Sequence, residues 1–375
     1  MCASLWAFSG PLNSHFDAHT SHLRRDGDGT LGAMTWQDEL VGFRMPAEWE
    51  HHERTIMGFP CHEAQWGEHL RQGQWAWAEV ARTIADFEPV TMLARPSDAE
   101  LAADLCAHSN ISIIEMEIDD AWLRDIGPIF GVNVDRTKRV GLDPSFNVWG
   151  SLYEARGFDY QVASRWCSMN AEISVRIPFV LEGGSIAVDG DGTVFTTEQC
   201  LLHPNRNPSM RRVDIEANLR SMLDVSAVVW LPFAIDDRDT NGHVDLIVVP
   251  VRPGVVLFQG CDDPSDAEHE RLSISRRCLD GAVDARGRAT EVIDLPVLPY
   301  AERWGERVPV PYANLYVCNG AVIVPVTGHE ADSDMLAIIG DAFPDRQIVG
   351  VPGDVIAYGG GGPHCITQQV PALDR

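Results

Sequence analysis

Basic residues are scarce in this chain. Lysine occurs once, at Lys138, and 29 basic side chains stand against 55 acidic ones among 375 residues. The net charge of −26 leaves no basic stripe that could neutralise phosphates, which argues against nucleic acid as a partner. An acidic surface instead attracts a cationic small molecule, although acidity that merely keeps a protein in solution would look the same.

Long hydrophobic runs are also missing. No stretch approaches the ~18 apolar residues that a membrane-spanning helix needs, so we expect no membrane partner. The first residues lack a basic segment followed by a continuous apolar one, so we expect no secretory signal. The nine cysteines are scattered without a CxxC pair, which argues against a zinc ribbon or a disulfide framework and predicts a cytoplasmic protein.

One supersecondary unit recurs along the chain. A β-hairpin is followed by a helical pattern and then by a short apolar strand, and this unit returns at roughly 50–70-residue intervals, about five times. The fold class is therefore α/β, and a five-bladed α/β propeller of ββαβ units around a pseudo-fivefold axis explains the hairpins better than a doubly wound sheet does. We expect residues 1–43 to be a mobile N-terminal extension and residues 44–375 to form a single catalytic domain.

Turn signals and periodicity place the elements of these units. The expected hairpins cover residues 129–142, 185–197, 244–259 and 314–326. Helical patterns cover residues 75–87, 210–223, 266–279 and 332–343. The apolar strands that follow helices cover residues 90–96, 175–180, 227–232, 291–296 and 347–352.

Each unit carries a polar cluster near the start of its hairpin. If the blades surround an axis, these equivalent positions converge on it and form a candidate site. Its members are Asp125, Glu182, His243, Asp245 and Cys365, with Asn314 nearby.

Taken singly, these residues are weak evidence. His243 and Asp245 alternate on an expected strand and so project the same way, but a histidine in such a pair is more often structural or metal-binding than catalytic. Cys365 alone is a nucleophile, a metal ligand or a packed thiol. Their recurrence at equivalent places of a repeat is what favours a common site.

The stretch YGGGGPHC, Tyr358 to Cys365, places four glycines and a proline before the His-Cys pair. Such a run serves geometry, since glycine costs backbone entropy on folding. It lets the backbone at Gly361 pass close to a substrate and aims the Cys365 thiol.

A thiol with a histidine supplies a nucleophile and a proton shuttle. Carboxylates beside the thiol would raise its pKa unless the substrate brings positive charge, as a planar guanidinium does. A metal site would use the same residue types. However, His243 is the one good imidazole ligand, because the side chain of His364 should point away from that of Cys365. We therefore expect no metal.

Eight motifs together resemble the agmatine deiminases, within the bacterial-type peptidylarginine deiminase family of the guanidine-modifying (pentein) superfamily. The resemblance runs from Met45 to Pro371, nearly the whole chain, in the order typical of that family. The motifs are MPAEWE, DDAWLRDIGP, LEGGSIAVDGDG, TTEQCLLHPNRNP, DTNGHVD, NGAVIVP, AFPDRQIVGVP and HCITQQ.

The resemblance implies the pentein fold and assigns roles to the candidate residues. Cys365 would be the nucleophile and His243 the general acid and base, without a metal or an organic cofactor. The implied reaction converts agmatine to N-carbamoylputrescine and ammonia through a covalent thiouronium intermediate. Asp125 and Asp245 would bind the guanidinium, Glu182 would be a further acid, Trp122 would wall the pocket, and Asn314 matches a polar site position.

Three departures from the usual pattern flank the expected pocket. Gly362-Pro363 replace an Asn and an Ile before the His-Cys pair, Pro311-Tyr312-Ala313 precede Asn314, and Leu246 follows GHVD where a polar residue is usual. They motivate two alternatives: a deiminase of another small guanidine, such as free arginine, a methylated guanidine or a specialised metabolite, and a non-catalytic guanidine-binding protein of the same fold. We do not expect action on peptidyl-arginine, because the sequence indicates neither a secretory signal nor an additional adhesive domain. The sequence leaves open whether the chain forms a homo-oligomer.

Overall fold

A computed structural model describes most of the chain. The described residues are 23–25, 31–33, 35–154, 157–237 and 239–374. Most of the predicted N-terminal extension lies outside them, so its mobility stays a prediction. Inside the extension, β1 (Leu23–Arg25) pairs antiparallel with β2 (Leu31–Ala33). The short helix α1 (Trp36–Glu39) follows, and Leu40 after it is buried in a hydrophobic cluster that includes Ile129, Val140 and Val175.

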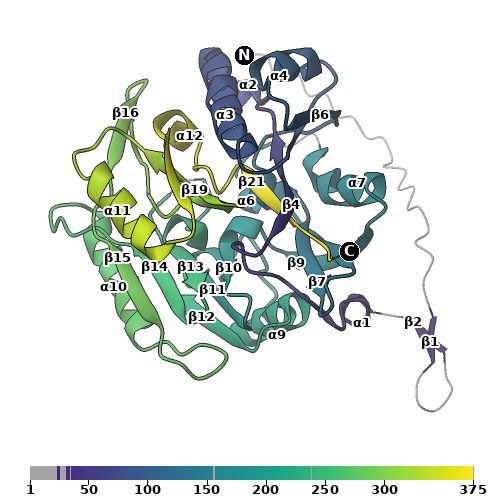
Figure 1. Ribbon diagram of the computed structural model, residues 1–375. Coiled ribbons are helices and arrows are strands. Elements are labelled where there is room, and N and C mark those ends of the chain that lie inside the picture. Colours follow the sequence, from purple (N-terminus) through teal and green to yellow (C-terminus); the bar gives the residue numbers. More distant parts are fainter. Residues whose placement is uncertain (1–22, 26–30, 34, 155–156, 238, 375) are drawn as a thin grey trace, which may run out of the picture.

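Five separate β-sheets make up the body of the molecule (Figure 1). In each sheet two strands pair antiparallel, and a further strand, reached through a helix, adds in parallel. The first two sheets are β21 (Thr367–Pro371), β4 (His52–Gly58), β5 (Val90–Ala94) and β6 (Ile111–Glu115), and β3 (Phe43–Arg44), β7 (Ile129–Asn133), β8 (Arg139–Ser145) and β9 (Ile173–Val180).

The other three sheets have three strands each. They are β10 (Ile186–Val188), β11 (Thr193–Thr197) and β12 (Ala227–Leu231), then β13 (Val248–Arg252), β14 (Val255–Gln259) and β15 (Glu291–Leu295), and finally β18 (Tyr316–Cys318), β19 (Ala321–Val326) and β20 (Gln347–Pro352). A separate hairpin of β16 (Tyr300–Arg303) and β17 (Glu306–Pro309) stands between the last two. The expected α/β fold of five ββαβ units is therefore confirmed.

Longer helices link the strands within the sheets and lie toward the outside of the body (Figure 1). They are α3 (Leu70–Ala85), α4 (Ala99–Leu105), α7 (Val162–Met169), α9 (Arg212–Leu223), α10 (Glu268–Asp280) and α11 (Asp332–Ala342). Short helical segments are α2 (Glu63–Trp66), η1 (Gly67–His69), α5 (Leu123–Ile126), α6 (Val148–Ser151), η2 (Asp159–Gln161), η3 (Gly183–Ser185), α8 (Glu198–Leu201), η4 (Val244–Leu246) and α12 (Asp354–Tyr358).

Hydrophobic patterning explains this arrangement. Helix α3 buries Trp77, Val80, Ala81 and Ile84, which recur at helical spacing and form one apolar face. The adjoining strand β5 is buried at all five positions, as expected for a strand covered on both faces. The core is thus divided among the blades and leaves the axis to polar side chains.

Two segments far apart in the sequence meet in one sheet. The C-terminal strand β21 pairs antiparallel with β4, with Gln369 opposite Thr55, and Figure 1 shows the yellow β21 beside the purple β4. Cys365 precedes β21 by two residues. Closing the ring therefore carries this thiol to the centre of the molecule.

The hairpin expected over residues 244–259 needs a correction. Residues 244–246 form the 3-10 turn η4, and the strand begins only at Val248. His243 and Asp245 therefore do not alternate along a strand. The turn is closed by backbone hydrogen bonds from Leu246 to the His243 carbonyl at 3.4 Å and from Ile247 to the Val244 carbonyl at 2.9 Å. Just before it, Asn241 and Gly242 have positive φ values of 61° and 84°, which are unusual in a regular strand.

Candidate active site

The structure brings the predicted site residues together at the axis. Trp122 and Asp125 belong to the segment of α5, His243 and Asp245 to that of η4, and Glu182, Asn314 and Cys365 each stand just before a short turn or strand of their own. Asp125, Glu182, His243, Asp245, Asn314, Cys365 and Trp122 are all buried, with at most 6% of each residue exposed.

Gly184 marks the point where the charged groups converge. A Cβ atom at this glycine would lie 2.5 Å from His243 Nδ1, and 3.0 Å from both Asp125 Oδ1 and Asp245 Oδ2. The Gly184 backbone N–H also donates to Asp125 Oδ1 at 2.9 Å. A side chain at Gly184 would therefore displace these groups, which is a physical reason for glycine in LEGGS.

Cys365 lies among polar partners in a buried place. Its Sγ is 3.4 Å from Asp245 Oδ2 and 3.4 Å from Asn314 Oδ1. Burial raises the pKa of the Cys365 thiol well above its usual value, and the negative charges of Asp245 and Asp125 raise it further. These carboxylates therefore oppose formation of the thiolate.

The imidazole of His243 stands between two carboxylates. Nδ1 lies 3.9 Å from Asp125 Oδ2, and Nε2 lies 4.0 Å from Glu182 Oε2. Within the part of the chain that the structure describes, neither ring nitrogen has a hydrogen-bond partner. Both nitrogens are thus available for proton exchange or for another ligand.

A recess leads to the thiol. Its walls are Cys365, Asp125, Trp122, Trp149, Tyr153, Gln65, Asp239, Thr240, Gly359 and Gly360. The glycine run shapes it in two ways. Gly360 has φ of 111°, which other residues avoid. A Cβ at Gly361 would lie 2.8 Å from the Trp122 ring and 2.9 Å from Cys365 Sγ, so the backbone itself passes beside the thiol.

Trp149 is a site residue that the sequence did not indicate. Its indole Nε1 donates to Asp125 Oδ2 at 2.8 Å, and its ring lines the recess. It sits in a loop where Val148, Trp149 and Ser151 all have positive φ, between 51° and 63°. Such backbone strain is often found at functional sites. Here it accompanies the placement of a donor on Asp125.

A buried charge network stands behind Asp245. His364 Nδ1 contacts Asp245 Oδ2 at 2.7 Å, and its Nε2 contacts Glu48 Oε2 at 2.9 Å, which Arg124 also reaches at 3.1 Å. His364 thus shares an Asp245 oxygen with Cys365, so setting it aside on sequence grounds missed a contact of the site. Burial alone would raise the pKa of Glu48, but His364 and Arg124 lower it to about 2.

His364 gives the folding stability a defined pH dependence. Burial and Arg124 act to lower its pKa, but Glu48 and Asp245 outweigh them and raise it above 6.5. Because the pKa of His364 is higher in the folded than in the unfolded protein, its contribution to folding stability is complete below pH 6.5. This contribution is lost as the pH rises through the pKa of the folded protein. We expect His364→Asn to lower the free energy of unfolding more at pH 6 than at pH 9 in urea titrations. The exposed His329→Asn is the control, and equal losses at both pH values would contradict this account.

Glu182 lies on the far side of His243 from the recess lining. It is fully buried, and its Oε1 is 2.7 Å from Nε of the equally buried Arg206. Burial raises the pKa of Glu182, while Arg206 and His243 oppose that rise. Arg206 also donates to the Thr240 carbonyl at 2.8 Å and to Asn241 Oδ1 at 2.9 Å. It therefore connects Glu182 to the loop that ends at His243.

We expect Arg206→Met to destabilise the fold strongly. It would leave the Glu182 charge buried without its cation, which typically costs about 3–5 kcal/mol of unfolding free energy. Denaturant titration measures this loss, and Arg211→Met, which breaks an exposed ion pair with Asp214, should change little. If Arg206→Met lowers the free energy of unfolding no more than Arg211→Met does, the pair of Arg206 and Glu182 does not stabilise the fold as proposed.

The three sequence departures lie beside the recess. Leu246 and Pro311 line a neighbouring cavity that shares Asp239 and Gly360 with it. At Gly362 a Cβ would lie 2.6 Å from Asn314 Oδ1, so this position needs glycine in the present arrangement.

Among the described residues, no helix combines the length and apolarity required to cross a membrane.

Comparisons with known proteins agree with this geometry. A model of the Porphyromonas-type peptidyl-arginine deiminase family matches residues 44–371. The agmatine deiminase of Pseudomonas aeruginosa is 40% identical over 354 residues, which cover 88% of this chain and 96% of the relative. That of Ectopseudomonas mendocina is 40% identical over 365 residues, covering 91% and 99%.

Solved structures show the same fold. The agmatine deiminase of Enterococcus faecalis, described as catalysing its reaction, superposes with a TM-score of 0.86 at 35% identity and covers 91% of this chain and 98% of its own. The substrate-bound agmatine deiminase of C. jejuni has a TM-score of 0.81 at 25% identity, covering 89% and 97%. The resemblance read from the motifs is thereby confirmed.

Proposed function

Because the chain belongs to the Porphyromonas-type peptidyl-arginine deiminase family, we propose that it hydrolyses agmatine to N-carbamoylputrescine and ammonia. The observation that carries the proposal is that the His243 imidazole and the carboxylates of Asp125 and Asp245 converge beside Gly184, with the Cys365 thiol 3.4 Å from Asp245. Of these residues, Cys365 and Asp125 line the recess. Relatives that are 40% identical over most of the chain are agmatine deiminases, which supports this substrate.

Substrate charge starts the reaction. The guanidinium enters between Asp125 and Asp245 and offsets the negative charge that keeps the Cys365 thiol protonated. The thiol proton passes to His243, and the sulfur attacks the guanidinium carbon. The tetrahedral adduct then expels one nitrogen, which takes a proton from His243 and leaves as ammonia. An S-alkylthiouronium remains on Cys365.

Water completes the cycle. His243 takes a proton from a water molecule that attacks the thiouronium carbon, and the carbon–sulfur bond then breaks to give the ureido product. The Cys365 sulfur leaves as a thiolate and takes the proton back from His243, while the hydroxyl proton of the product is released to water. Acid–base assistance of this kind contributes typically ~10²–10⁴ in rate. No redox step and no cofactor chemistry is required.

Asp239, one of the recess walls, suits the amine of agmatine. It accepts a hydrogen bond from the Tyr153 hydroxyl, and a Cβ atom at Gly360 would lie 2.9 Å from its Oδ2. We expect Asp239→Asn to raise KM for agmatine about tenfold or more, because a charge-assisted hydrogen bond is lost. An alkylguanidine of equal length without the amine is the control, and its KM should hardly change. A parallel rise for both compounds would place the amine elsewhere.

A small guanidine fits better than peptidyl-arginine. Only 4% of Cys365 is exposed, and Trp122, Trp149 and Tyr153 wall the way to it. Another small guanidine remains the second candidate, because Leu246 and Pro311 border the cavity beside the recess. Ammonia release from agmatine, free arginine and methylated guanidines, measured side by side, tests the proposal. Agmatine turnover far below that of another compound would transfer the mechanism to that substrate.

A further inference from the structure

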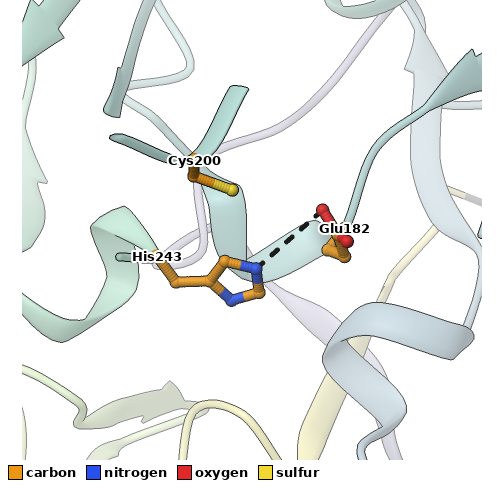
Figure 2. Close-up of side chains that lie close together, drawn as sticks. All are labelled: Glu182, Cys200 and His243. Atoms are coloured by element: carbon orange, nitrogen blue, oxygen red, sulfur yellow. Dashed lines mark ion pairs between the residues drawn. The ribbon is translucent and has the colours of Figure 1, made fainter. Parts of the chain in front are cut away.

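A third side chain approaches His243 from behind. Cys200 belongs to α8 and follows the Thr197 side chain that caps this helix. Ligand atoms of Glu182, Cys200 and His243 all lie within 4.8 Å of one another. Figure 2 shows the thiol and the carboxylate turned toward the same edge of the imidazole ring. Over the described part of the chain, no other trio of His, Cys, Asp or Glu side chains meets this criterion.

The three side chains are fully buried, and those of His243 and Glu182 lack hydrogen-bond partners among the described residues. All of them are 0% exposed. Neither nitrogen of His243 and neither oxygen of Glu182 has a hydrogen bond within the described residues, although Arg206 forms an ion pair with one oxygen. Buried polar groups without partners are costly, so such a cluster is expected to bind something that satisfies them.

We propose that Glu182, Cys200 and His243 form a binding site for a thiophilic divalent cation such as Zn²⁺. One sulfur, one imidazole nitrogen and one carboxylate oxygen are donors that Zn²⁺ accepts, with a water in the fourth position. Binding forms a metal–sulfur bond and releases the Cys200 thiol proton to water, without transfer of electrons.

The observed spacing is close to what this coordination needs. Glu182 Oε2 and His243 Nε2 are 4.0 Å apart. In a tetrahedral site with bonds near 2.1 Å they would be about 3.4 Å apart, which small side-chain movements achieve. Arg206 on the other Glu182 oxygen takes the place that outer partners of ligating carboxylates usually occupy.

Occupancy would inhibit the enzyme without filling the guanidinium recess. The site uses the Nε2 edge of His243, whereas Nδ1 faces Asp125 and Gly184. An imidazole that holds a metal at Nε2 carries at most one proton, at Nδ1, and cannot alternate between acid and base. This inhibitory consequence rests on the proposed function, whereas metal binding itself does not.

Binding is tested with Cd²⁺ on the full chain in a Cys365→Ala background, which removes the nucleophile as a competing thiol. We expect an ultraviolet thiolate-to-Cd²⁺ charge-transfer band that saturates at one equivalent. The band should be lost when Cys200→Ser is added and retained when Cys278→Ser, an exposed cysteine, is added instead. Absence of the band, or its persistence without Cys200, would overturn the proposal.

Two further measurements keep the outcome clear. If the Cys200→Ser variant does not fold, Glu182→Gln in the same Cys365→Ala background should weaken the Cd²⁺ band, and an unchanged band would again overturn the site. In the otherwise native enzyme, Zn²⁺ should reduce agmatine turnover, and Cys200→Ser should remove this sensitivity, each variant being compared with its own metal-free rate. Inhibition that persists in Cys200→Ser would contradict the inhibitory role. A Cd²⁺ band in Cys365→Ala, together with an otherwise native enzyme that turns over no guanidine, would refute the proposed function and leave the metal site standing.

Discussion

Cys365→Ala is expected to abolish ammonia release from agmatine, with kcat falling by about 10⁴-fold or more, because loss of a nucleophile removes the covalent path. The residue is the one thiol on the recess lining, as far as the described residues show. The measurement is steady-state ammonia production at saturating agmatine.

The matched control is Cys278→Ser, which changes an exposed cysteine and should leave turnover unaltered. Agmatine should still bind to Cys365→Ala, since Asp125, Asp245 and Asp239 remain. Turnover that survives in Cys365→Ala would contradict the role of Cys365 as the nucleophile. It would favour the alternative of a non-catalytic guanidine-binding protein, with the measured activity coming from another source.

His243→Asn is expected to lower kcat by about 10²–10⁴-fold, because proton transfer to ammonia and from water both lose their carrier. Asn conserves polarity and approximate size, so the variant should keep the fold. Its effect should fall on kcat much more than on KM, since we propose that Asp125 and Asp245 bind the guanidinium.

The exposed His329→Asn serves as the control for replacing a histidine. A His243→Asn enzyme with near-native kcat would show that another group moves the proton. His364, which contacts Asp245 at 2.7 Å, would then be the first residue to test.

The fold could be predicted because its signal is local and repeated. Hairpin, helix and strand recur with clear turn residues, and the elements over residues 210–223 and 347–352 appear nearly where the pattern placed them. The prediction of a strand directly after His243 was wrong for a local reason. VDLIVV looks like a strand, but the backbone N–H groups of Leu246 and Ile247 donate to the carbonyls of His243 and Val244 and close a 3-10 turn before the strand begins at Val248.

The supporting residues of the site could not be predicted in this way. Their contacts join distant parts of the chain: Glu48 meets His364 across 316 positions, and Trp149 reaches Asp125 from a strained loop. Arg206 stood inside a motif, HPNRNP, but nothing local indicated its pairing with Glu182. Such contacts exist only once the ring of blades has closed.

The most direct measurement is mass spectrometry of the enzyme quenched during turnover of agmatine, followed by peptide mapping. The account predicts a thiouronium adduct on the peptide that contains Cys365, absent from Cys365→Ala and from enzyme without substrate. Steady ammonia release with no adduct on Cys365 at any quench time, while chemistry limits the rate, would contradict covalent catalysis by this thiol.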